Sequence, residues 1–181
     1  MSEATRPEAP LLRAELASLS AYHVPAAPVR VRLDANESPW ALPEAAQREI
    51  AEALSRIELH RYPDPHASEL RAALARYAGA QERELSIGVG SDELIATLIT
   101  ALAEPRPGAQ RACVLFPDPS FVMYGLIARA RGVRAVTVPL DARFDLDAQL
   151  WIEAIERERP NLIFLPTPNN PTGNAFDQEA L

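Results

Sequence analysis

The segment Asn161-Leu162-Ile163-Phe164-Leu165-Pro166-Thr167-Pro168-Asn169-Asn170-Pro171-Thr172-Gly173 decides how the rest of the chain is interpreted. Its first five residues are mostly apolar, as in a buried strand, and the strand stops abruptly in Pro, Asn and Gly. In open α/β sheets, ligands bind at the carboxyl ends of strands, where loops present polar groups. Asn169 and Asn170 lie at such an end, between prolines that restrict the backbone. The segment therefore indicates a binding loop or an ordinary tight turn, and local composition alone favours the turn.

Hydrophobic periodicity before this segment predicts helices and strands in alternation. The strand at 112–116 has no polar alternation, which is typical of a strand buried on both faces. Asp177 is expected to cap one more helix. The alternation predicts βαβ crossovers, and hence an α/β fold in which helices cover both faces of a mostly parallel sheet. We expect helices over 43–57, 68–77, 92–102, 121–131 and 147–157, strands over 29–33, 112–116, 134–138 and 161–165, and a short strand or extended segment over 85–89.

Composition restricts the class of protein. The chain has 181 residues, 48% of them hydrophobic, which is enough for a domain with a real core. A net charge of −7 without a basic stripe argues against nucleic-acid binding. No apolar run is long enough to span a bilayer, and the first residues lack a signal-peptide pattern, so we expect no membrane association and a cytoplasmic location.

The residue types present argue against a metal site and against a reaction that uses a lysine side chain. His23, His60, His66 and the single cysteine, Cys113, lack metal-ligand spacing. All 18 basic residues are arginine. A reaction that needs a lysine amine therefore cannot be carried out by these residues alone.

Two further loops could bind a ligand. Gly88-Val89-Gly90-Ser91-Asp92-Glu93 opens a helix. There Ser91 can cap the helix, and the free N–H groups together with the helix dipole favour a phosphate. An N-cap with Asp92 and Glu93 complementing the helix dipole, without any ligand, explains the same residues. Phe121 follows the strand at 112–116 and either stacks on a flat ligand or packs into the core. Together with Asn170, these loops predict a site for a flat, phosphorylated, hydrogen-bonding ligand if they share one sheet edge.

Several motifs, in one order and spacing, resemble those of a known enzyme family. They are Leu33-Asp34-Ala35-Asn36-Glu37-Ser38-Pro39, Arg61-Tyr62-Pro63-Asp64, Gly90-Ser91-Asp92-Glu93-Leu94, Pro119-Ser120-Phe121-Val122-Met123-Tyr124 and Pro168-Asn169-Asn170-Pro171-Thr172-Gly173. From about Leu12 onward, the chain resembles the amino-terminal half of histidinol-phosphate aminotransferase, a pyridoxal-phosphate enzyme of fold type I.

The resemblance implies roles for particular residues. Gly90, Ser91 and Asp92 would hold the phosphate of pyridoxal 5'-phosphate, Phe121 would stack on its ring, and Asn170 would hydrogen-bond its phenolic oxygen.

The resemblance also implies contacts outside this cofactor-ring site. Tyr62 would reach the cofactor phosphate of a partner subunit, which implies a homodimer with shared sites. Tyr22 and Asn36 would line the substrate pocket. Residues 1–40 would form an N-terminal arm and a portion of the small domain, and residues 41–181 an incomplete large cofactor-binding domain of three layers.

The implied reaction moves an amino group between L-histidinol phosphate and 2-oxoglutarate, giving glutamate. The family's Schiff-base lysine has no counterpart here, so we expect no catalytic residue within this chain and no activity from it alone. The alternatives are another fold-type-I enzyme, such as an aromatic aminotransferase or a threonine-phosphate decarboxylase, and a non-catalytic truncated module. A dinucleotide-dependent oxidoreductase is disfavoured because no complete glycine fingerprint is present.

Overall fold

The computed structural model describes residues 13, 16, 19, 30–31 and 37–181. It divides into two compact units, one formed by Ala21–Leu85 and the other by Met1–Ser20 together with Ser86–Leu181. Each unit is described by itself. The boundary predicted at residue 40 stays a prediction, and most of the strand predicted at 29–33 lies outside the described residues, with Arg30 and Val31 in a bend.

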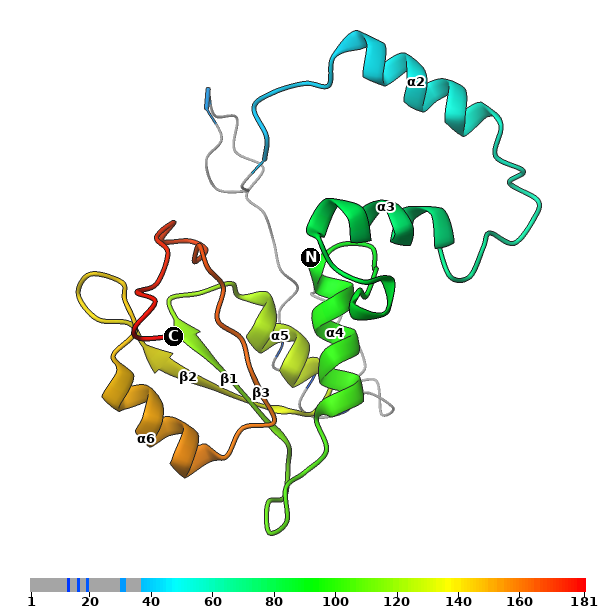
Figure 1. Cartoon of the computed structure of the whole chain (residues 1–181). Helices are drawn as coiled ribbons and strands as arrows, with labels where there is room; N and C mark the ends of the chain where they lie inside the picture. Colours follow the sequence, from blue (N-terminus) through cyan, green and yellow to red (C-terminus); the bar gives the residue numbers. More distant parts are fainter. Residues whose placement is uncertain (1–12, 14–15, 17–18, 20–29, 32–36) are drawn as a thin grey trace, which may run out of the picture. The chain divides into compact units, whose positions relative to one another are not determined.

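The larger unit is built on a parallel sheet, as predicted. Its strands are β1 (Cys113–Asp118), β2 (Arg134–Pro139) and β3 (Leu162–Ile163), in the order β2-β1-β3 (Figure 1). All pairs are parallel, with Cys113 opposite Arg134 and Val114 opposite Leu162. The central strand β1 is buried along most of its length, which confirms the expectation drawn from its continuous apolar sequence.

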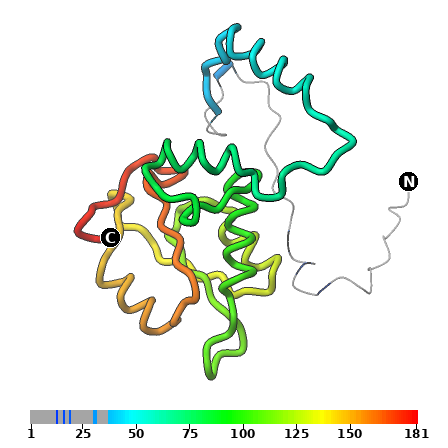
Figure 2. The backbone as a smooth tube through the Cα atoms, turned by 45° about the vertical axis from the view of Figure 1, so that its right-hand side comes forward, coloured from blue at the N-terminus to red at the C-terminus, as the bar shows by residue number. Residues whose placement is uncertain are grey.

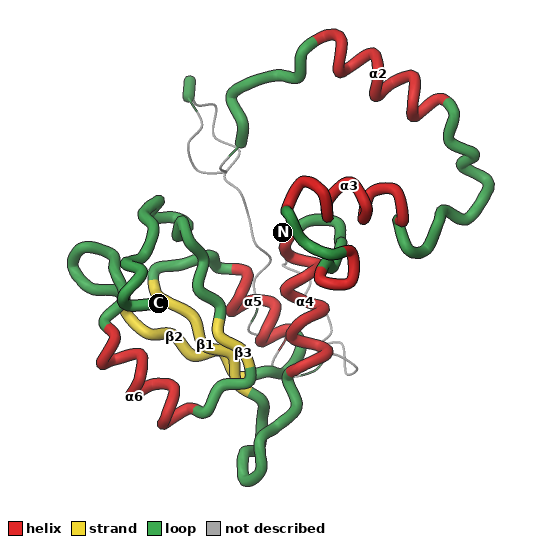
Figure 3. Tube along the Cα trace, in the orientation of Figure 1, coloured by secondary structure: helices red, strands yellow, loops and turns green. Residues whose placement is uncertain are grey.

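Helices cover both faces of this sheet. The helices are α4 (Ser91–Leu102), α5 (Met123–Ala130) and α6 (Ala148–Glu158). Because successive residues of a strand point to opposite faces, Val114 packs into a cluster with Ile99 of α4 and Ala128 of α5, whereas Leu115 packs into another with Trp151 of α6. This unit therefore has three layers, with the sheet between α4 and α5 on one side and α6 on the other (Figures 2 and 3).

Two local expectations concern the ends of regular elements. Residues 85–89 form no strand, but Leu85 is extended and the chain runs without regular structure from the short helix η1 (Glu82–Glu84) to α4, so of the two alternatives expected there the extended segment stands. The helix expected after Asp177 is absent among the described residues: the Asp177 carboxylate accepts from Glu179 N at 2.8 Å, as an N-cap would, but the residues that follow form a turn. Within the described part of the chain, no helix is both long and apolar enough to cross a bilayer.

The smaller unit contains α2 (Glu44–Ser55), α3 (Ser68–Ala78) and η1. Asp64 fixes the start of α3, since its carboxylate accepts from His66 N at 2.9 Å and Ser68 N at 2.7 Å. Arg71 of α3 donates to the carbonyl of Leu85 at 2.5 Å, which ties α3 to the segment after η1. Helix α2 follows its predicted range but buries no residue within the described part.

The hydrogen bonds at Asp64 predict a pH dependence of α3. Hydrogen bonds from Ser68, and then from the His66 N–H, lower the pKa of Asp64 from 3.8 to about 2. Because the folded pKa is depressed, this stabilisation is present above the unfolded pKa and is lost as pH falls through about 2. We expect NMR titration to place the Asp64 midpoint near 2, with amide protection of α3 falling over the same range.

The variant Asp64→Asn should abolish this pH dependence of α3 protection, since the amide cannot ionise. A matched control is Glu69→Gln, which removes a carboxylate from the first turn of α3 without touching these bonds. An Asp64 midpoint close to 3.8, or equal behaviour of the two variants, would contradict the capping role.

Candidate functional site

The side chain of Asn169 joins two loops at the carboxyl ends of the strands. It is only 2% exposed. Its Nδ2 donates to the carbonyl of Pro119 at 3.0 Å and to Thr172 Oγ1 at 2.8 Å, and its Oδ1 accepts from Ser120 Oγ at 3.0 Å. The loop after β1 and the loop after β3 are therefore held together by one buried amide.

The turn that follows Asn169 is closed by its own backbone. Asn169 N donates to the carbonyl of Asn174 at 2.8 Å, and Gly173 N donates to the carbonyl of Asn169 at 2.7 Å. Gly173 has a φ of +78°, a conformation that other residues rarely adopt. Asn174 Nδ2 donates to the carbonyl of Phe144 at 2.8 Å, so the loop after β2 is attached as well. All three strands thus lead into one connected group of loops.

Asn170 lies in this turn with its side chain exposed, next to the buried Asn169. The amide of Asn169 is fully engaged within the protein, whereas that of Asn170 faces solvent. The sequence left open a tight turn or a binding loop, and each alternative applies to a different residue. Asn169 builds the turn, and Asn170 is accessible to a ligand.

Phe121 is half-buried at the end of the loop after β1. Its ring meets Tyr124 edge-on, with centroids 5.6 Å apart and an angle of 85°. Tyr124 in turn stacks on Phe164 at 4.7 Å and 8°. Part of Phe121 therefore packs against the core, which was one of the two alternatives that the sequence left open. Phe121 lies before the first residue of α5 and does not belong to the helix.

Tyr124 was not singled out from the sequence. It packs between Phe121 and Phe164, and burial raises the pKa of its hydroxyl. The available signal was the spacing of three residues from Phe121, because the helix predicted over 121–131 would make residues three apart neighbours.

The amino end of α4 differs in detail from the expectation. Gly90, with φ +82°, is the N-cap, and Ser91 is the first helical residue, so the prediction that Ser91 caps the helix is wrong. A Cβ at Gly88 would lie 2.8 Å from Glu93 Oε2, whereas a Cβ at Gly90 would meet nothing within 4 Å. Val89 N donates to Glu93 Oε2 at 2.5 Å. No side-chain cap covers Gly90, and the space beside it is open.

The remaining candidates lie elsewhere. Tyr62 belongs to the smaller unit, where its side chain is fully exposed. Tyr22 and Asn36 lie outside the described residues. Among the residues that the structure describes, no group of His, Cys, Asp and Glu side chains is arranged to hold a metal ion.

Comparison with known proteins finds matches over most of the chain. Residues 29–181 match the family model described as aminotransferase class I and II. The chain is 45% identical over 170 residues to a histidinol-phosphate aminotransferase of Chromobacterium violaceum, covering 93% of this chain and 46% of that protein. It is 44% identical to one of Thiocapsa roseopersicina, covering 93% of this chain and 88% of that protein. The chain thus spans about half the length of the Chromobacterium relative.

Solved structures show the same fold. The histidinol-phosphate aminotransferase of Sinorhizobium meliloti, solved in complex with pyridoxal-5'-phosphate, superposes with a TM-score of 0.66 at 28% identity, over 77% of this chain and 36% of that one. An aspartate aminotransferase mutant of Thermus thermophilus reaches 0.71 at 22% identity, over 93% of this chain and 45% of that one. The predicted large-domain fold, present here in part, is therefore confirmed.

The two adjacent asparagines give a matched test of the loop architecture. We expect Asn169→Ala to lower the free energy of unfolding by about 2 kcal/mol, because it leaves buried partners of the amide unsatisfied. Asn170→Ala should change it by less than about 0.5 kcal/mol, since that side chain is exposed. Urea unfolding of both variants measures this difference, and equal losses would show that Asn169 does not hold the loops together.

Proposed function

Because the chain belongs to the class I and II aminotransferases and is a homologue of histidinol-phosphate aminotransferases, we propose that the protein carrying this sequence moves an amino group between L-histidinol phosphate and 2-oxoglutarate, in histidine biosynthesis. The structural observation that supports this proposal is the exposed amide of Asn170, which lies on a turn fixed by the buried Asn169. A rigid, outward amide at the carboxyl end of a parallel strand suits recognition of a polar ligand.

The described residues fit pyridoxal 5'-phosphate. The open space beside Gly90, at an amino end without a side-chain cap, suits a phosphate, which would accept from the N–H groups of Gly90, Ser91 and Asp92. The half-exposed ring of Phe121 would stack on the cofactor ring, and Asn170 would donate to its phenolic oxygen. When bound, the cofactor supplies an electron sink for a substrate carbanion.

The further assignments belong to the same proposal. Tyr62, fully exposed on the segment that Asp64 anchors, would contact the cofactor phosphate of a partner subunit in a homodimer. Tyr22 and Asn36 would line the substrate pocket. Residues 1–40 would form the arm and part of a small domain, and residues 41–181 part of the cofactor-binding domain, in a protein of the cytoplasm.

The missing lysine limits what this chain does by itself. A Schiff base and the associated proton transfer need an amine that residues 1–181 do not contain. Within the complete protein these residues would therefore orient the cofactor without supplying a catalytic residue, and we expect the 181-residue chain alone to bind the cofactor weakly, if at all. The absence of lysine equally supports the competing proposal of a non-catalytic binding or dimerisation module.

Activity assays test the proposal. We expect the protein translated from the complete reading frame to convert histidinol phosphate with 2-oxoglutarate, and the isolated 181-residue chain to show no turnover. In the complete protein, Asn170→Ala should weaken cofactor binding roughly tenfold, since it removes a hydrogen bond to a charged group. Absorbance titration with pyridoxal phosphate measures the affinity.

A suitable control is Gln149→Ala, which removes an exposed amide from α6 and should leave affinity and turnover unchanged. Turnover by the 181-residue chain alone would overturn the inactivity of this segment. Preference for aromatic amino acids, or decarboxylation of threonine phosphate, would assign the protein to another enzyme of the same fold. A reading frame that stops at Leu181 would favour the non-catalytic module.

A further inference from the structure

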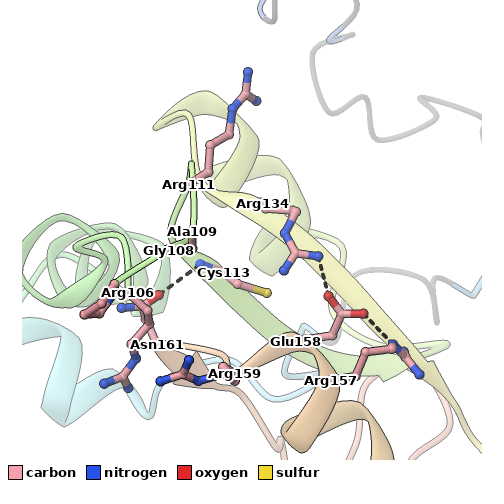
Figure 4. A pocket seen from close by; sticks show the side chains of 11 residues that line it. Arg106, Gly108, Ala109, Arg111, Cys113, Arg134, Arg157, Glu158, Arg159 and Asn161 are labelled. Carbon is pink, nitrogen blue, oxygen red and sulfur yellow. Dashed lines mark hydrogen bonds and ion pairs between the residues drawn. The ribbon is translucent and has the colours of Figure 1, made fainter.

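A pocket opens at the amino-terminal ends of the three strands, at the edge of the sheet opposite Asn169 (Figure 4). Its volume is about 260 Å³. Cys113 and Arg134, the first residues of β1 and β2, line it together with Asn161, which directly precedes β3. The loop at 106–111 and the end of α6 complete its wall.

The pocket concentrates positive charge. Its lining holds five arginines and one carboxylate, an excess of four positive charges, in a chain whose net charge is −7. Guanidinium groups keep their charge at any physiological pH. The charged lining residues are Arg106, Arg111, Arg134, Arg157, Arg159 and Glu158.

The one carboxylate is already occupied. Glu158 accepts from Arg134 Nη1 through one oxygen and from Arg157 Nε, at 2.7 Å, through the other. Its side chain is only 15% exposed, and hydrogen bonds from Arg134 and then Arg157 lower its pKa. Figure 4 shows both arginines pointing toward Glu158, whereas Arg111 extends away from it. Glu158 therefore cannot also neutralise Arg106 and Arg159.

Two arginines of the lining lack a carboxylate partner among the described residues. The Nη2 of Arg106 lies 3.4 Å from the carbonyl of Pro160, which is a long and neutral contact. Arg159 ends α6 in a left-handed conformation, φ +46°, and its side chain makes no ion pair within the described part. Their guanidinium groups can thus engage a ligand.

The base of the pocket is fixed by Asn161. Its Oδ1 accepts from Cys113 N at 3.0 Å, its Nδ2 donates to the carbonyl of Glu104 at 2.7 Å, and its own N–H donates to the carbonyl of Cys113 at 2.7 Å. These bonds join β1, the start of β3 and the segment after α4. The pocket is consequently built on rigid elements, which favours a preorganised site.

We propose that this pocket binds a compact phosphate-class oxyanion with two or more negative charges, held by Arg106 and Arg159 beside the Arg134–Glu158–Arg157 group. Planar guanidinium groups match phosphate oxygens in paired hydrogen bonds. The charge excess disfavours cations and neutral molecules, and the volume of about 260 Å³ accommodates a small oxyanion such as pyrophosphate. The site depends only on this sheet edge and not on the proposed transamination.

Calorimetric titration of the protein with inorganic pyrophosphate tests the proposal. In the variant R106Q/R159N we expect the dissociation constant to rise at least roughly tenfold, as the loss of charge-assisted hydrogen bonds implies. Asparagine tolerates the left-handed conformation of residue 159, so the turn should persist. The matched control R83Q removes one arginine from η1, which contributes no residue to the pocket lining, and should bind like the wild type.

Two results would overturn the site: no pyrophosphate binding to the wild type, or equal affinity in R106Q/R159N and R83Q. The second would place the binding elsewhere, including the amino end of α4. Thermal unfolding of each variant without ligand checks folding. If the double variant is unfolded, R106Q and R159N are measured singly, and each must weaken binding relative to R83Q for the proposal to stand.

Discussion

The hydrogen bonds of the buried Asn169 side chain determine where the candidate binding groups lie. A buried amide without partners is costly, and this one is satisfied by Pro119, Ser120 and Thr172. Its partners come from the loops after β1 and β3, which are neighbours because β1 is the central strand. The exposed Asn170 and the half-buried Phe121 therefore take their positions from a residue that itself faces away from solvent.

Sequence patterns predicted the sheet well because burial alone imposes them. The continuous apolar run at β1 required cover on both faces, and Leu115 and Val114 indeed pack into different clusters. Local capping was harder to predict. Ser91 has the chemistry of an N-cap, yet the positive φ of Gly90 turns the chain one residue earlier, so the helix already includes Ser91. Asp177 likewise has capping chemistry but closes a turn.

The sequence indicated which residue types form the candidate site, but it did not indicate which of them is buried and which is exposed. Asn169 and Asn170 are identical side chains, and only the approach of Pro119, about fifty residues earlier, decides which of them is buried. The arginine pocket escaped the sequence argument for the same reason. Its arginines are dispersed between positions 106 and 159 and meet only because parallel strands start at one edge.

Parallel pairing links the two edges of the sheet through one register. The register that places Val114 and Leu115 on opposite faces also sets Cys113 opposite Arg134 at one edge and Asp118 opposite Pro139 at the other. A slip of one residue would turn Leu115 away from Trp151 and invert every side chain of that strand. The apolar core therefore does more than stabilise the fold. It aligns the arginines before the strands and the loops after them, so both polar edges follow from the burial of a few apolar side chains.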